Sequence, residues 1–176
     1  MVGKLLVARP SILGDPSFSR SVILMTEHND ENALGFIVNQ PTHYNLSELL
    51  PEYRHDIPVF KGGPVDQDRL FYLHALKTIP NAIQIGKDLF WGGDLEAIIS
   101  AINSGELSSK KIKFLLGYTG WGKNQLTKEL KENSWLLIKN NYDLFSEETT
   151  LWGNILRKIG GELALYASAP SSPGLN

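Results

Sequence analysis

The sequence predicts an α+β fold, in which strands and helices follow one another in no regular order. Short apolar, β-branched segments recur along most of the 176 residues, and amphipathic helical segments interrupt them at irregular intervals. A strict strand–helix–strand period, which would indicate a parallel doubly wound sheet, is not found. With 42% apolar residues the chain can build a proper core, so we expect one domain over residues 1–168 and a flexible tail over 169–176.

The predicted strands are runs of apolar residues bounded by turn-forming residues. They cover residues 4–8, 20–26, 33–41, 59–65, 69–76, 81–86, 111–118, 134–140 and 162–168. The polar cluster at 28–32 predicts a turn, so residues 20–39 are expected to form a hairpin. Residues 69–76 alternate in character, which places His74 on the same face as apolar neighbours.

The predicted helices are marked by capping residues at their ends. They cover residues 45–50, 95–105, 125–133 and 150–161. Asn45, Asp94 and either Thr149 or Thr150 are the expected N-caps, because their side-chain oxygens can accept from the first free backbone N–H groups. Gly105 is the expected end of the second helix, since glycine readily adopts the left-handed conformation found there.

Composition excludes several classes of protein. The chain has no cysteine, which removes disulfides, thiolate nucleophiles, cysteine-ligated zinc and iron–sulfur clusters. The N-terminus has an apolar run of only four residues before Arg9, too short for a secretory signal, and no segment is long enough to span a bilayer. We therefore expect a cytoplasmic protein with no membrane contact. The net charge of −2 disfavours nucleic-acid binding, whose affinity comes mainly from neutralising phosphates.

Charge is unevenly distributed along the chain. Residues 27–69 hold eight acids and three bases, a net charge of −5, whereas residues 104–139 hold seven lysines and three glutamates, a net charge of +4. Solvated helix and strand faces explain this pattern most simply. A positive patch that faces an acidic partner, or the acidic part of a second copy in a homo-oligomer, is the alternative.

The glycine-rich segment 117–124 has the form G-x-x-x-x-G-K and lies between a predicted strand and a predicted helix, as a phosphate-binding P-loop does. The eighth position fails, because Asn124 cannot place a hydroxyl on Mg²⁺ as serine or threonine would. Asn124 is better explained as the N-cap of the following helix. An anion or small-ligand site at this helix start, near Lys123, stays open.

The four histidines show no metal-binding spacing, so we expect no metal and no cofactor. Convergence of His28 and His74 in space with an acidic residue stays open, but a turn histidine and a half-buried strand histidine are the simpler interpretation. No serine lies in a nucleophile motif, and the four tryptophans are expected to pack in the core.

Gly62, Gly63 and Pro64 predict a sharp turn after a strand, and Asn39 and Pro41 end the preceding strand in a similar way. A sharp turn between strands can also present backbone N–H groups to a ligand. The structural interpretation as a turn is the safer one.

Several segments in a fixed order carry a resemblance to a known family: KLLVARP, DPSFSRSVILMTEH, LGFIVNQP, the GGPV turn, RLFYLHAL, LLGYTGWGKNQLTKEL and NSWLL. Together they resemble the AlgH/YqgE family of bacterial proteins, from about Gly3 to about Ala167. The resemblance implies a bifurcated, strongly bent, mostly antiparallel sheet that is partly closed into a small barrel and flanked by helices. It departs at Asn124, where the family usually has glycine, and at Asn32-Ala33, where it usually has Gly-Ala.

Family members are often labelled transcriptional regulators. Because these segments carry no recognisable catalytic constellation, the first hypothesis is a non-enzymatic regulatory or binding protein that acts through a protein partner or an anionic small ligand. A hydrolase or transferase acting on an anionic small molecule, with His28 or His74 as general base, is the second hypothesis. Direct nucleic-acid binding is the third, through the lysines Lys110, Lys111, Lys113, Lys123, Lys128 and Lys131. The candidate ligand-binding residues lie mainly on predicted turns and strand ends. They are His28, Asn39, Gly62, Gly63, Pro64, Arg69, His74, Gly120, Trp121 and Gln125.

Overall fold

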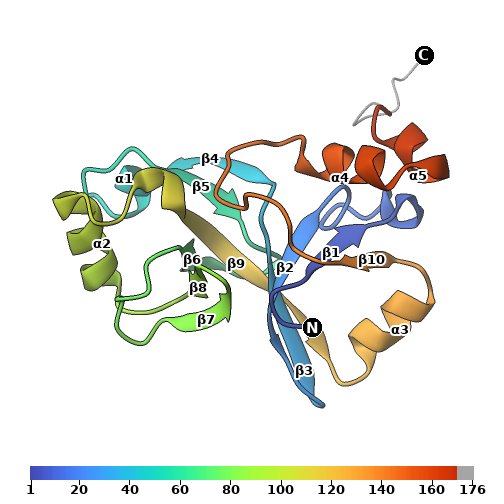
Figure 1. The fold of residues 1–176 in the computed structure, drawn as a ribbon, viewed down its shortest axis with the longest axis horizontal. Coiled ribbons are helices and arrows are strands. Elements are labelled where there is room, and N and C mark those ends of the chain that lie inside the picture. Colours follow the sequence, from blue (N-terminus) through green and yellow to red (C-terminus); the bar gives the residue numbers. More distant parts are fainter. Residues whose placement is uncertain (170–176) are drawn as a thin grey trace.

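The computed structural model describes residues 1–169, so all of the predicted tail except Ala169 lies outside the described residues. The strands are β1 Leu5–Ala8, β2 Val22–His28, β3 Asn32–Ile37, β4 Pro41–Asn45, β5 Pro58–Lys61, β6 Val65–His74, β7 Ile83–Gly86, β8 Leu89–Trp91, β9 Ile112–Gly122 and β10 Trp135–Ile138. The helices are α1 Leu46–Leu49, α2 Leu95–Ser104, α3 Gln125–Lys131, α4 Leu151–Ile159 and α5 Gly161–Tyr166. The α+β prediction is confirmed (Figure 1).

The sheet branches at β9, the longest strand. Its main path runs β10-β1-β2-β3-β9-β6-β8-β7, and β5, with β4 beside it, pairs with β9 outside that path. The second half of β9 pairs with β3, while its first half lies between β6 on one edge and β5 on the other. Only the β5–β9 pair is parallel among the described pairs. The bifurcated, mostly antiparallel sheet is therefore as expected.

The expected partial closure into a barrel is wrong. The path begins at β10 and ends at β7, and these two terminal strands do not pair within residues 1–169. Closure requires the strand edges at the two ends of a sheet to meet. Instead, the strands that pair with β9 change along its length, so the two arms of the sheet diverge on either side of that strand (Figure 1).

The chain crosses β9 between β5 and β6, and this crossing explains the Gly62-Gly63-Pro64 turn. A Cβ atom on Gly62 would lie 2.2 Å from the carbonyl oxygen of Gly117, and one on Gly63 would lie 2.1 Å from the carbonyl carbon of Tyr118. Gly117 itself has φ +71°, and a side chain there would meet the carbonyl oxygen of Gly63 at 2.6 Å. Backbone contact this close is open only to glycine.

Two hydrophobic clusters lie on either side of the branch. One packs β1, β2, β3 and β10 against α4, and the other packs β5 and the start of β9 against α1 and α2. In Figure 1, α1 and α2 lie on one side of the molecule and α4 lies on the other, and β9 runs from the first side towards the second. Trp121, Trp135 and Trp152 are buried in the first cluster and Trp91 packs against it, as the expectation of core tryptophans requires.

The helix caps follow the sequence at three of the five predicted sites, and the exceptions are Thr150 and Asn124. Asp94 accepts a hydrogen bond from the backbone of the first turn of α2 at 2.9 Å, Gly105 ends that helix at φ +79°, and Asn45 forms a capping box at α1. Thr150 holds the N-cap position of α4 but makes no side-chain capping bond, because its hydroxyl donates to Glu148.

Several predicted boundaries are wrong. The predicted strand 162–168 is wrong, because residues 162–166 belong to the helix α5. Gly160 and Gly161 have φ of +81° and +61° and reverse the chain, and good helix formers follow them. The strand predicted over 33–41 is divided into β3 and β4. β8 was not predicted, because its three residues are too few to show a period.

We expect Gly63→Ala to destabilise the fold strongly, since neither backbone at the crossing can move aside for a methyl group 2.1 Å away. Unfolding in urea is expected to show a loss of about 3 kcal/mol. Gly14→Ala is the matched control, because a Cβ atom there meets nothing within 4 Å. Equal stability of the two variants would contradict this account of the crossing.

Candidate functional site

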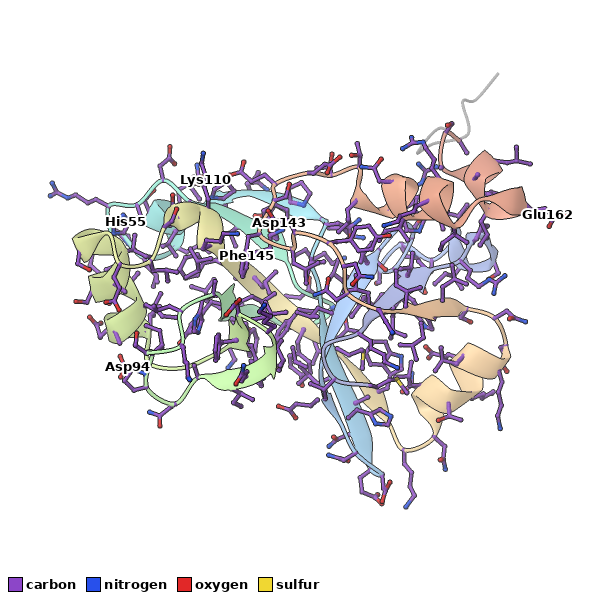
Figure 2. The ribbon with its side chains drawn as sticks, in the orientation of Figure 1. His55, Asp94, Lys110, Asp143, Phe145 and Glu162 are labelled. Atoms are coloured by element: carbon purple, nitrogen blue, oxygen red, sulfur yellow. The ribbon has the colours of Figure 1, made fainter. Side chains whose placement is uncertain are left out.

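A depression of about 300 Å³ lies where the start of β9 meets the connection between β10 and α4. Residues 143–147 of that connection, which we call the strap, form one wall, and β5, β9 and the short 3-10 turn Ser109–Lys111 form the others. Figure 2 shows Lys110, Asp143 and Phe145 gathered at this place. The lining residues are Pro58, Phe60, Ser109, Lys110, Ile112, Lys113, Asp143, Phe145, Ser146 and Glu147. We call it the Lys113 depression.

Lys113 is a buried cation on the wall of this depression, only 3% exposed. Its ammonium donates to the carbonyl oxygens of Val38 at 2.7 Å and of Ser146 at 2.8 Å. The same nitrogen lies 3.9 Å from the centre of the Phe60 ring, within range of a cation–π contact. Lys113 therefore ties the strap to the end of β3 and to β5.

Burial lowers the pKa of Lys113 to about 8, and the carboxylates of Asp143 and Glu147 oppose this effect only in part. A titratable group so perturbed at the edge of a cavity is a common mark of a functional site. The depression also carries both signs of charge: two lysines on β9 and the turn before it, and two carboxylates on the strap. Such a site can bind a molecule that has one group of each sign and an apolar body.

Lys113 is not among the ligand-binding residues predicted from the sequence, where it belongs only to the lysines of a hypothetical nucleic-acid surface. One signal was present: a lysine flanked by Ile112 and Phe114 within an apolar strand. A lysine in such a strand is seldom fully buried unless something pairs with it. The two carbonyl groups that pair with it belong to Val38 and Ser146, which lie 75 and 33 residues away in the sequence.

His74 lies in the core and not at a surface site. Its ring is fully buried on β6, its Nε2 pairs with the carbonyl oxygen of Gly92 at 3.0 Å, and it stacks on Phe90 with ring centres 5.8 Å apart. Burial lowers its pKa, although the carbonyl of Gly92 opposes this effect. The geometry gives a substrate no access to His74 as a general base.

Trp121 and Gln125 belong to a polar clamp that joins α3 to the sheet. Glu129 accepts from the indole nitrogens of Trp121 and Trp135, each at 2.8 Å, and from the amide of Gln125 at 3.0 Å. Gly120 lies in β9 opposite a residue of β3. The expected glycine-rich loop is therefore largely strand, since β9 continues to Gly122, and this removes the P-loop resemblance.

Asn124 begins α3 in a different way from that predicted. Its φ is +61°, in the left-handed region, and its side chain makes no capping bond. Asparagine is the residue that most often replaces glycine at positive φ. This explains how Asn124 can stand where the resemblance places glycine.

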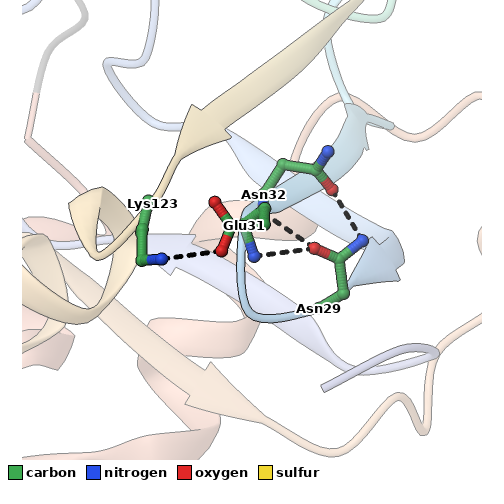
Figure 3. A network of polar contacts seen from close by, with 4 residues as sticks. All are labelled: Asn29, Glu31, Asn32 and Lys123. Atoms are coloured by element: carbon green, nitrogen blue, oxygen red, sulfur yellow. Dashed lines mark hydrogen bonds and ion pairs between the residues drawn. The ribbon is translucent and has the colours of Figure 1, made fainter.

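His28 is exposed at the end of β2 and lines a small depression of about 140 Å³ with Lys123 and Asn124. Figure 3 shows the neighbouring hairpin turn, where Lys123 pairs with Glu31 at 2.7 Å. The side chain of Asn29 organises that turn through hydrogen bonds to Glu31 and Asn32. Of the two histidines considered as general bases, only His28 lines one of the five depressions described among residues 1–169.

The remaining predicted residues lie elsewhere. Arg69 is exposed on β6 and pairs with Asp66 at 3.7 Å. Asn39 is buried, where it accepts from the backbone of Val22 at 2.8 Å and donates to the carbonyl of Arg20 at 2.9 Å. None of the five depressions described between residues 1 and 169 joins the 62–64 crossing with His74. The structure thus places the ten predicted residues at several separate positions.

No three histidine, aspartate or glutamate side chains among residues 1–169 are arranged to hold a metal ion. In the same part of the chain, none of the helices combines the length and apolar character that crossing a bilayer requires.

Comparison with known proteins gives consistent matches over nearly the whole chain. The family model described as AlgH-like matches residues 5–164. UPF0301 protein BF2109 of Bacteroides fragilis is 39% identical over 99% of this chain and 90% of its own length, and a UPF0301 protein of Cytophaga hutchinsonii is 39% identical over 99% and 98%.

Two solved structures share the fold. The solution structure of AlgH from Pseudomonas aeruginosa is 28% identical, with a TM-score of 0.72 over 96% of this chain and 93% of that one. The crystal structure of protein DIP2367 from Corynebacterium diphtheriae has a TM-score of 0.78 over 96% and 92%, and its 23% identity makes it a likeness of fold alone.

We expect Glu129→Ala to lower the free energy of unfolding by about 3 kcal/mol, because two buried indole N–H groups lose their acceptor. Chemical denaturation followed by tryptophan fluorescence measures this. Glu132→Ala removes the same charge from an exposed ion pair with Lys128 on the same helix and is expected to cost less than about 0.5 kcal/mol. Similar losses in both variants would contradict the clamp.

The lowered pKa of Lys113 predicts a pH dependence of stability. Between pH 8 and about 10.5 the unfolded chain binds a proton that the folded chain has lost, so stability rises with pH in this window. The free energy of unfolding of the wild type, relative to that of Lys113→Met, is expected to rise by up to about 3 kcal/mol from pH 8 to 10.5. A flat difference between the wild type and Lys113→Met would show that Lys113 is not desolvated.

Proposed function

The chain belongs to the AlgH-like family, and from that premise we propose that it is a regulatory binding protein whose ligand is a small zwitterionic molecule held in the Lys113 depression. The observation that carries this proposal is a buried ammonium beside a cavity lined by charges of both signs. It acts by binding, and its regulatory effect passes through the strap rather than through contact with DNA.

The lining supports a ligand with two charged groups of opposite sign. Lys110 and the remaining N–H of Lys113 suit a carboxylate, and Asp143 and Glu147 suit an ammonium group. Phe60 and the other apolar wall residues suit a hydrocarbon body between the two. An apolar amino acid has this chemistry. The volume of about 300 Å³ lies at the lower end of small-molecule sites, which agrees with a ligand of that size.

The strap couples the depression to its surroundings. Ser146 accepts one of the two hydrogen bonds of Lys113, and Asp143 and Phe145 also line a second depression, of about 490 Å³, on the other side of the strap. A ligand carboxylate that draws the ammonium away from Ser146 frees the strap, which leads directly into α4. This is the route by which the ligand changes the surface that a partner meets.

The geometry supports this proposal over direct nucleic-acid binding. Lys110 and Lys111 precede β9, while Lys123 and the lysines of α3 follow it. A strand of 11 residues separates these groups by roughly 35 Å, so they make no continuous positive stripe. Lys113 is buried, and Lys123 is paired with Glu31.

We expect free apolar amino acids such as leucine, methionine and phenylalanine to raise the melting temperature. Ligand at a hundred times its dissociation constant adds about 2.7 kcal/mol, which is several degrees for a chain of this length. The N-acetyl and methyl-ester derivatives of the same amino acids are expected to have no effect, because each removes one of the two charges. Thermal unfolding of the full chain measures both.

Variants identify which residues bind the carboxylate and which bind the ammonium group of the ligand. Lys110→Gln is expected to weaken binding through the carboxylate and Glu147→Gln through the ammonium, whereas Lys139→Gln, an exposed lysine outside the depression, is expected to have no effect. Equal shifts with free and blocked amino acids, or no shift with any of them, would overturn the proposal.

A further inference from the structure

A separate depression of about 250 Å³ lies between the loop before β2 and α4. Its lining residues are Ser19, Arg20, Asn39, Gln40, Thr149, Thr150, Trp152, Gly153, Arg157 and Ala167. This set, drawn from residues 1–169, holds two arginines and no carboxylate. It shares no residue with the Lys113 depression, so its arginines are separate from the lysines and carboxylates that line that depression.

The backbone around Arg20 is held firmly by two neighbouring side chains. Asn39 donates to the carbonyl of Arg20 at 2.9 Å, and Gln40 donates to the carbonyl of Ser19 at 3.3 Å. Arg20 has φ +57°, a conformation that a residue of its kind seldom adopts without such support. Its guanidinium lies 5.3 Å from the centre of the Trp152 ring and donates to Ala169 at 2.8 Å. Arg20 is therefore fixed at the wall of the depression before any ligand arrives.

Arg157 reaches the same depression by folding back along α4. Two of its guanidinium nitrogens lie 3.7 Å from the position that a Cβ atom would take on Gly153, one turn earlier. Its Nη1 donates to the neutral amide of Asn154 at 2.7 Å, and Arg157 forms no ion pair among residues 1–169. Its charge is thus not neutralised by a carboxylate in the described part of the protein.

We propose that this depression binds the phosphoryl group of a small molecule. Guanidinium groups match phosphate oxygens with paired donors in a fixed plane, and two of them line one cavity here. The hydroxyl groups of Ser19, Thr149 and Thr150 add neutral partners. The carboxylate of Glu148, which accepts from Thr150 and Asn154, is not among the lining residues.

The test measures the binding of inorganic phosphate to the full chain by calorimetry at constant ionic strength. Arg157→Gln is expected to weaken binding at least tenfold, and Arg157→Lys by a smaller factor, because lysine keeps the charge but loses the paired donors. Arg54→Gln removes the same charge from an exposed residue outside the depression and is expected to change binding less than twofold.

Amide chemical shifts give a second measurement that does not depend on any variant. Phosphate is expected to shift the amide signals of Ser19, Thr149 and Gly153, and to leave those of Ser109 and Lys113 unchanged. No binding, equal weakening by Arg157→Gln and Arg54→Gln, or shifts confined to other parts of the chain would each overturn the proposal. Because the two depressions share no residue, failure of this site leaves the amino-acid proposal untouched, and the reverse holds.

Discussion

The architecture depends on one backbone crossing. The chain passes from one edge of β9 to the other at Gly62 and Gly63. Its backbone there packs so closely against Gly117 and Tyr118 that no side chain would fit. Gly62 donates to the carbonyl of Leu116 at 2.7 Å and accepts from Ile37 at 2.8 Å, so β3, β5 and β9 meet at one residue. Because β9 pairs with β5 and β6 along its first half and with β3 along its second half, the sheet splits into two arms, and a hydrophobic cluster forms on each.

Two partly or fully buried charges fix the segments that the sheet itself cannot hold. Glu129 binds α3 to β9 and β10 through two indole groups, and Lys113 binds the strap to β3 and β5 through two carbonyl groups. These two contacts differ in consequence. The first is enclosed by tryptophan packing and serves stability, whereas the second borders a cavity, where a ligand can compete for the same donors. This difference is why the candidate site lies at the strap.

The two proposed sites are joined by a short segment of chain. The strap ends at Glu147. Thr149 and Thr150 follow it, just before α4, and both line the depression that contains Arg20 and Arg157. The proposed zwitterion site and the proposed phosphoryl site therefore lie at the two ends of one short connection.

The sequence by itself determined the elements whose signals are local. Periodicity and capping residues gave most strands, the caps at Asp94 and Asn45 and the end at Gly105, because each depends on neighbours within a few residues. It failed for α5 and β8, where a chain reversal or a short strand is decided by packing. The site was decided by tertiary structure alone. Lys113 donates to Val38 and Ser146, which lie far from it in the sequence. Arg20 and Arg157 line one depression although more than a hundred residues separate them. Burial of a charge and its partners arise only when such segments pack, so no local pattern could locate them.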